Sequence, residues 1–208
     1  MKNILLLAGP RTGSHILMEY LRNAKYRIQE VYDDQEKKMF DNPLYNPINK
    51  IIPTVVHTHY PRLKAKKYYQ IITYRKNTFD QIMSFCVATQ HSEFLFEEYT
   101  VQSKQFSLSI LDFDSTCCQF FDHKQHKLKL KKRKKQVIIS YDEITSNPNI
   151  LKDILNINYY QEHWENKKNP NQAVNLVINY QELLDYFLSK WNKKFNDINN
   201  DLLYKFCK

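Results

Sequence analysis

The chain of 208 residues carries a formal net charge of +9 and 42% hydrophobic residues, which fits one globular domain over residues 1–208. No apolar run approaches the roughly 20 residues that span a bilayer, and the run 4–8 is too short for the core of a signal peptide, so we expect no transmembrane segment and a cytoplasmic location. Four cysteines without a C-x-x-C spacing indicate neither a zinc site nor a disulfide framework, and the positive charge favours anionic partners such as a nucleotide, an acidic glycan, nucleic acid or a membrane surface.

The first predicted elements flank the two glycines of the chain, Gly9 and Gly13, which lie in one stretch near the N-terminus. Average usage would give roughly fifteen glycines, so this pair indicates a place where the backbone must stay bare. The apolar run before them predicts a buried strand, and residues 16–21 predict the following helix. The turn between them aims backbone N–H groups and a positive helix end at one point, which suits phosphate or sulfate. An ordinary strand-to-helix turn is the alternative, but it does not need the fixed charge of Arg11.

Further along the chain, apolar segments alternate with helix-like ones. The strand-like segments, rich in β-branched and aromatic residues, are 26–31, 54–59, 69–74 and 137–141. The helical segments are 78–88, 93–99, 106–121, 149–155 and 180–206, and residues 33–50 form a polar loop or short helix. This order predicts an α/β fold: a single three-layer domain with a central parallel sheet and a P-loop, and with helices on both faces.

The glycine-containing loop departs from the ATP-binding loop G-x-x-x-x-G-K-S/T, because its spacing is one residue short and Ser14 stands where that loop has lysine. It resembles instead the 5′-phosphosulfate loop, P-K/R-S/T-G-S/T, of sulfotransferases that use 3′-phosphoadenosine 5′-phosphosulfate (PAPS). The resemblance implies a cradle for the phosphosulfate built from Pro10, Arg11, Thr12, Gly13, Ser14 and His15. In this cradle the backbone N–H groups and the hydroxyls of Thr12 and Ser14 would face the donor.

A second motif begins where the predicted strand 69–74 ends. Arg75 is followed about two helical turns later by Ser84, which places both near the carboxyl edge of the sheet, where such folds bind ligands. The segment resembles the 3′-phosphate site of sulfotransferases, which reads R-x-x-x-x-x-x-A/V-x-S or R-x-D-x-x-x-Q-A-V-S. The match runs through Arg75, Gln81 and Ser84, with Lys76 as a possible substitute for the arginine. The alternative is an exposed helix start with a solvated Arg-Lys pair.

The third motif is His57-Thr-His-Tyr-Pro61, which resembles the K-T-H-x-P segment of sulfotransferases. The resemblance implies that His59 removes a proton from the acceptor, and a histidine near its unperturbed pKa is a competent base at neutral pH. His57 replaces the lysine of the family, which puts the role of that lysine in doubt. The two histidines share a strand face, but no carboxylate or cysteine stands at ligand spacing, so we expect no metal. Partly exposed structural histidines are the alternative.

The longest match, over residues 137–155, resembles the sulfotransferase segment h-x-Y-E-D-L-x-x-N/D-P and implies that Tyr141 lies near the adenine. Asn147 can cap a helix with Pro148 in its first turn. A strand followed by Asp142 and Glu143 also resembles the magnesium-holding motif of ATPases, against which the missing loop lysine counts. Beyond residue 155 the match fades, since the family's late R-K-G loop has only Lys167 and Lys168 as counterparts.

The run 124–135 holds eight basic residues directly before the last predicted strand. Such a run suits contact with an anionic polymer or lipid, or is a solvated loop, and no aromatic residue is interleaved with the lysines to stack bases.

Together the motifs predict a PAPS-dependent sulfotransferase that needs no metal. His59 would act as general base and Arg11 would stabilise charge on the leaving group, while the acceptor, a hydroxyl or amine on a glycan, lipid or small molecule, is not specified by the sequence. The alternatives are a P-loop nucleotide kinase and a catalytically inactive, sulfotransferase-like anion-binding protein.

Overall fold

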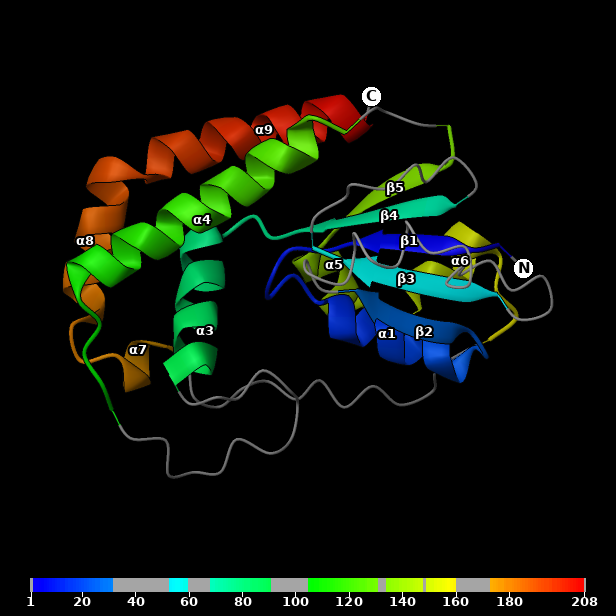
Figure 1. Cartoon of the computed structure of the whole chain (residues 1–208), viewed down its shortest axis with the longest axis horizontal. Helices are drawn as coiled ribbons and strands as arrows, with labels where there is room; N and C mark the ends of the chain where they lie inside the picture. The colour runs from blue at the N-terminus through cyan, green and yellow to red at the C-terminus, as the bar shows by residue number, and fades with distance from the viewer. Residues whose placement is uncertain are drawn as a thin grey trace.

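The computed structural model describes residues 2–31, 53–59, 68–90, 105–130, 134–147, 149–159 and 173–207. At its centre lies a five-stranded sheet in the order β2-β3-β1-β4-β5, with every neighbouring pair parallel (Figure 1). The strands are β1 (Ile4–Leu7), β2 (Arg27–Val31), β3 (Thr54–Thr58), β4 (Tyr69–Tyr74) and β5 (Gln136–Ser140). The predicted parallel sheet is therefore confirmed, and β1 occupies its middle, where the strand order reverses. Ligands of open parallel sheets bind at such a point.

The sheet is covered on both faces because alternate residues of its central strands are buried on opposite sides. Ile4 and Leu6 of β1 pack on one face against helices α1 (Ser14–Asn23), α5 (Tyr141–Ser146) and α6 (Ile150–Leu155). Leu5 and Leu7 pack on the other face with Leu202 and Phe206 of helix α9 (Asn192–Cys207). The predicted helical layers on both faces are confirmed.

The remaining helices form a second core beside the sheet, which the sequence prediction did not include. These are α3 (Thr78–Gln90), α4 (Ile110–Leu128), α7 (Ala173–Leu176) and α8 (Tyr180–Lys190). They lie beyond the end of the sheet at which β4 leads into α3 (Figure 1). Their aromatic side chains pack together, and Phe187 contacts both Phe79 and Phe195 of α9. Helix α9 belongs to both cores, since Phe195 packs here while Leu202 packs on the sheet.

Two of the predicted helices differ from the structure by more than two residues. Ser109 caps α4 by accepting a hydrogen bond from the backbone N–H of Asp112, so this helix begins at residue 110, and it continues to 128 instead of ending at 121. The predicted helix 180–206 is two helices, α8 and α9, which meet at Trp191. The predicted helix 93–99 and the loop 33–50 lie outside the described residues.

Candidate functional site

The loop between β1 and α1, residues 8–13, holds both glycines, each for a different physical reason. We call it the phosphate loop, after the ligand that the sequence resemblance implies. Gly13 has a left-handed backbone (φ 82°), and a Cβ there would lie 3.2 Å from Cδ2 of Tyr141. Gly9 is needed for space instead, because a Cβ there would lie 3.0 Å from Cε1 of His123. The bare backbone predicted at these two positions is therefore confirmed. Arg11 is also left-handed (φ 57°), which costs a side-chain-bearing residue on the order of 1 kcal/mol and is typical of functional loops.

Thr12 fastens this loop to the sheet. Its side chain is 1% exposed, and its hydroxyl donates to the carbonyl oxygen of Gly9 at 2.8 Å. The same oxygen lies 2.6 Å from Oγ1 of Thr73 on β4. Since the single Thr12 proton is used by Gly9, Thr73 is the donor in this second hydrogen bond. The sequence resemblance implied that the Thr12 hydroxyl faces the phosphosulfate. In the structure this hydroxyl bonds within the loop and to β4.

The start of α1 is open toward the loop. Gly13 occupies the N-cap position, offers no side-chain cap, and no acidic residue stands in the first turn. The first-turn N–H groups of a helix have no partner within the helix, and the helix dipole adds positive potential there. Ser14 and His15 are the first two residues of this helix, so the predicted anion cradle coincides with a helix N-terminus.

Helix α3 holds the loop from the side through two hydrogen bonds. The Gln81 amide donates to the carbonyl oxygen of Pro10 at 2.7 Å. The Arg11 Nε donates to the Ser84 hydroxyl at 3.0 Å. The sequence matched Gln81 and Ser84 to a 3′-phosphate site, and the structure places both of them against the phosphate loop itself.

Arg75 reaches the same loop by way of an aromatic ring. It follows the last residue of β4, and its Cζ lies 4.4 Å from the centroid of the Tyr141 ring. Tyr141 is the first residue of α5 and faces Gly13 at close contact. The structure thus brings Arg75, Tyr141 and the loop together, while Lys76, the alternative cation, is exposed.

Glu143 is used in capping α5. It accepts hydrogen bonds from the backbone N–H and the hydroxyl of Ser140, at 2.7 and 2.6 Å, and completes a capping box. A carboxylate engaged in this way is poorly placed to hold magnesium for a kinase. Among the described residues, no group of three or more His, Cys, Asp or Glu side chains is arranged to hold a metal ion.

Four histidines form a row beside the loop. The ring centroids of His15 and His57 lie 6.3 Å apart, those of His57 and His59 5.3 Å, and those of His59 and His123 6.4 Å. His57 is 3% exposed, its Nδ1 lies 3.7 Å from a carboxylate oxygen of Glu30, and its Nε2 has no hydrogen-bond partner among the described residues. The predicted base, His59, therefore lies between two other imidazoles.

Burial shifts the titration of this row. Desolvation, helped by the neighbouring His57 and Lys127, lowers the pKa of His59 to about 4. Burial also lowers the pKa of His15, and that of His123 well below its ordinary value. The expectation that His59 titrates near its unperturbed pKa is wrong for the ligand-free protein. The imidazoles of His15, His59 and His123 are therefore neutral at pH 7, so each keeps a lone pair that can accept a proton.

The basic run 124–135 does not form one exposed surface. Lys124 and Lys127 lie on the inner side of α4, at 5% and 3% exposure. The Lys127 Nζ donates to the carbonyl oxygen of Thr73 at 2.9 Å, and the Lys124 Nζ donates to Asn199 at 2.7 Å. Residues 131–133 lie outside the described residues, and the end of the run at 134–135 is exposed.

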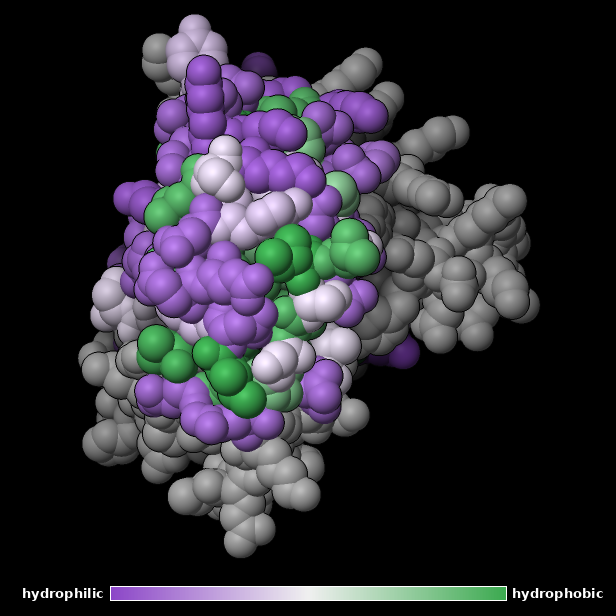
Figure 2. Space-filling view, turned by 90° about the vertical axis from the view of Figure 1, so that its left-hand side faces the viewer, coloured by the Kyte–Doolittle hydropathy of each residue, from purple (hydrophilic) through white to green (hydrophobic). Residues whose placement is uncertain are grey.

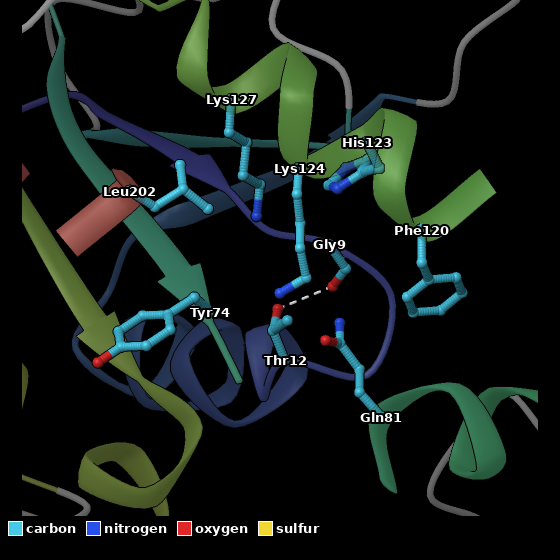
Figure 3. A pocket seen from close by; sticks show the side chains of 9 residues that line it. All are labelled: Gly9, Thr12, Tyr74, Gln81, Phe120, His123, Lys124, Lys127 and Leu202. Carbon is cyan, nitrogen blue, oxygen red and sulfur yellow. Dashed lines mark hydrogen bonds between the residues drawn. The ribbon is translucent and has the colours of Figure 1, made fainter. Parts of the chain in front are cut away.

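These two lysines line a small pocket behind the loop (Figure 3). Its lining consists of Gly9, Thr12, Tyr74, Gln81, Phe120, His123, Lys124, Lys127 and Leu202. Sequence reasoning did not find His123 or the two lysines as neighbours of the site. The signal was present, because the buried positions of α4 follow helical spacing from Phe113 through Cys117, Phe120, Lys124 and Lys127.

The described part of the chain contains no helix that is both long and apolar enough to cross a membrane. The thiols of Cys86, Cys117 and Cys118 are free.

No family model and no curated protein matches the sequence. The solved structures that match the fold include two sulfotransferases. The mouse sulfotransferase SULT7A1 complexed with PAP is 17% identical, with a TM-score of 0.52, over 97% of this chain and 84% of that one. The sulfotransferase domain from the curacin biosynthetic pathway is 15% identical, with a TM-score of 0.51, over 99% of this chain and 98% of that one. The chain therefore has a sulfotransferase-like fold.

Proposed function

We propose that this protein is a sulfotransferase that takes the sulfuryl group of PAPS and transfers it to a hydroxyl or amine. The observation that carries the proposal is the convergence of Arg11, Ser84 and the Arg75–Tyr141 pair on one loop within a sulfotransferase-like fold. The similar mouse sulfotransferase was solved with PAP, which supports a nucleotide of this kind as the ligand. The backbone at Thr12 to His15 would hold the 5′-phosphosulfate, and Arg75 with Ser84 would hold the 3′-phosphate.

In the transfer step, the acceptor oxygen or nitrogen attacks the sulfur while the bond from sulfur to the bridging phosphate oxygen breaks. Adenosine 3′,5′-bisphosphate leaves, and His59 takes the proton of the acceptor. The Arg11 guanidinium stabilises the negative charge that develops on the bridging oxygen. A sulfuryl group carries less charge than a terminal phosphoryl group, so the proposed reaction does not need a metal ion.

Two alternatives differ from this proposal in their ligands. A nucleotide kinase would need magnesium and ATP, and the capping role of Glu143 together with Ser14 in place of the loop lysine disfavours it. An inactive anion-binding protein would bind the nucleotide without turnover. Contact with an anionic polymer is limited, among the described lysines of the run, to the exposed Lys129, Lys134 and Lys135.

The test compares the melting temperature of the protein with three nucleotides. Adenosine 3′,5′-bisphosphate should raise it through linkage, whereas 5′-AMP, which lacks the 3′-phosphate, and ATP with magnesium should have much smaller effects. Equal stabilisation by magnesium-ATP would support the kinase and contradict the proposal. Transfer of radiolabelled sulfate from PAPS to a panel of hydroxyl, amine and glycan acceptors then separates the enzyme from the binding protein.

A further inference from the structure

Lys124 and Lys127, which we call the inner lysine pair, lie one turn apart on α4 and reach toward the back of the phosphate loop (Figure 3). A Cβ built on Gly9 would lie 3.6 Å from the Lys127 Nζ, so this amine approaches the first residue of the loop. Both side chains are almost fully buried. The sequence presented them as the start of a solvated basic run, but they form part of the wall behind the loop.

The hydrogen bonds of the inner lysine pair do not compensate its charge. Within the described residues, each amine donates to one neutral oxygen, that of Thr73 or that of Asn199. A protonated amine has three N–H donors, so two donors on each remain without a partner there. A buried cation without an opposite charge nearby destabilises the folded state, because no Coulomb attraction offsets the free energy of removing the cation from water.

The titratable groups around the pair are basic as well. His123 stands on the same helix, His59 faces Lys127 from the end of β3, and Lys205 of α9 donates to the carbonyl oxygen of Leu128. No carboxylate of the described residues acts on either amine. Burial lowers the pKa of both lysines to about 7, and repulsion from Lys124 contributes to the lowered pKa of Lys127. In the ligand-free protein the pair is therefore only partly protonated at neutral pH.

An anion in the phosphate loop would supply the missing opposite charge. The loop backbone separates it from the pair, and in this water-poor interior charges interact more strongly than they do across solvent. An opposite charge nearby favours the protonated form of an amine. We propose that the inner lysine pair is part of the donor site, and that the donor binds together with a proton that the pair takes up from solvent. For the identity of its ligand, this inference rests on the proposed function.

Isothermal titration of adenosine 3′,5′-bisphosphate at pH 8, in two buffers of different ionisation enthalpy, measures the proton directly. At this pH the ligand-free lysines have mostly lost their extra proton, whereas imidazoles whose pKa lies far below 7 do not exchange one. We expect uptake of close to one proton per ligand. Accordingly, the dissociation constant should rise by about three- to tenfold for each pH unit from 7 to 9.

Lysine-to-methionine variants show which side chain takes up the proton when the nucleotide binds. Lys127→Met should remove most of the uptake and flatten the pH dependence of the dissociation constant, with Lys124→Met acting in the same direction. Lys134→Met is the matched control, because this lysine belongs to the same basic run but is exposed. Melting temperatures verify that each variant is folded. If a variant does not fold, the buffer comparison on the unmodified protein still decides the inference.

The outcomes separate this inference from the proposed function. Nucleotide binding without proton uptake would overturn the inference and leave the sulfotransferase proposal intact. If the nucleotide does not bind but inorganic pyrophosphate binds with proton uptake, the inference stands and the proposed function fails. Binding of neither probe would overturn both. An equal loss of proton uptake in the Lys134 and Lys127 variants would also overturn the inference, since the proton would then not belong to the buried pair.

Discussion

The guanidinium of Arg75 lies over the ring of Tyr141, at 4.4 Å from its centroid, and a Cβ built on Gly13 of the phosphate loop would lie 3.2 Å from Cδ2 of the same ring. One aromatic side chain thus fixes the position of a cation proposed to bind the 3′-phosphate relative to a loop proposed to bind the 5′ end. From this contact we propose that Tyr141 orients Arg75, in addition to lying near the adenine as the sequence resemblance implied.

Replacing Tyr141 tests this role. A cation–π contact contributes about 0.5–2 kcal/mol, so Tyr141→Leu should weaken the binding of adenosine 3′,5′-bisphosphate by about two- to thirtyfold and leave 5′-AMP much less affected. Tyr141→Phe keeps the ring and should retain the preference for the 3′-phosphate. Binding constants for both nucleotides provide the measurement. If Tyr141→Phe loses as much as Tyr141→Leu, the hydroxyl and not the ring is responsible.

His59→Ala should lower kcat by about 10²- to 10⁴-fold while leaving the affinity for adenosine 3′,5′-bisphosphate nearly unchanged, because a general base acts on the acceptor. His57→Ala is the control, since this imidazole faces Glu30 and lies one ring contact away. An equal loss in both variants would show that the two histidines act together or that the base is misassigned.

The pH profile of kcat/KM offers an independent test of His59. The pKa of this imidazole is lowered to about 4 in the ligand-free protein, and a general base must be unprotonated. The apparent pKa of the acid limb, at which kcat/KM drops as the pH is lowered, should therefore lie well below 6.5. A limb at pH 6.5 or above would contradict the assignment of His59, because such a limb belongs to a group in an ordinary aqueous environment.

Thr73→Val should loosen the loop without touching the proposed ligand contacts. It removes the donor to the Thr12 hydroxyl and leaves a buried oxygen with one partner fewer, which costs about 1–3 kcal/mol. Denaturant unfolding should report this loss of stability, with a smaller loss of nucleotide affinity. Thr145→Val, at a half-buried hydroxyl that donates to backbone carbonyls of its own helix α5, serves as the comparison and should cost less, because this hydroxyl is more exposed than the buried pair of Thr12 and Thr73. Equal costs would argue against a special role of the loop contact.

The free energy of unfolding should rise with pH from about 7 to 10. The pKa values of Lys124 and Lys127 are lowered to about 7, whereas in the unfolded chain both amines keep their proton up to about 10.4. The unfolded state then binds more protons in this window, so stability increases with pH. Unfolding by denaturant at pH 7, 8 and 9.5 measures the slope, which Lys127→Met should reduce. If the free energy of unfolding of the unmodified protein stays constant or decreases over this pH range, the pair is not buried as a neutral species.

The sequence predicted the parallel sheet, because short segments rich in β-branched and aromatic residues alternate with helical segments along the chain. It also predicted the loop, because two glycines in an otherwise glycine-poor chain point to a backbone requirement that the φ of Gly13 explains.

The sequence did not predict which side chains stand behind that loop. Lys124 and Lys127 have the composition of a surface run, and only the helical spacing from Phe113 shows that they turn inward. The sequence did not predict the role of Thr12 either, because its partner Thr73 lies 61 residues further along the chain. A hydroxyl in a phosphate loop has no pattern in the sequence that distinguishes a ligand contact from an internal one.

Helix α9 gives the site a particular order of assembly. Its Asn199 accepts from Lys124 and donates to the carbonyl oxygen of Lys76 and the hydroxyl of Thr78, so it joins α4 to the turn that follows β4. Residues 192–207 follow every other described element in the chain. During synthesis on the ribosome, the phosphate loop and α4 emerge before α9, which adds Leu202 to the wall behind the loop and Asn199 as the partner of Lys124. A nascent chain that lacks α9 should therefore fail to hold the nucleotide, although every residue proposed to touch the nucleotide has already been made.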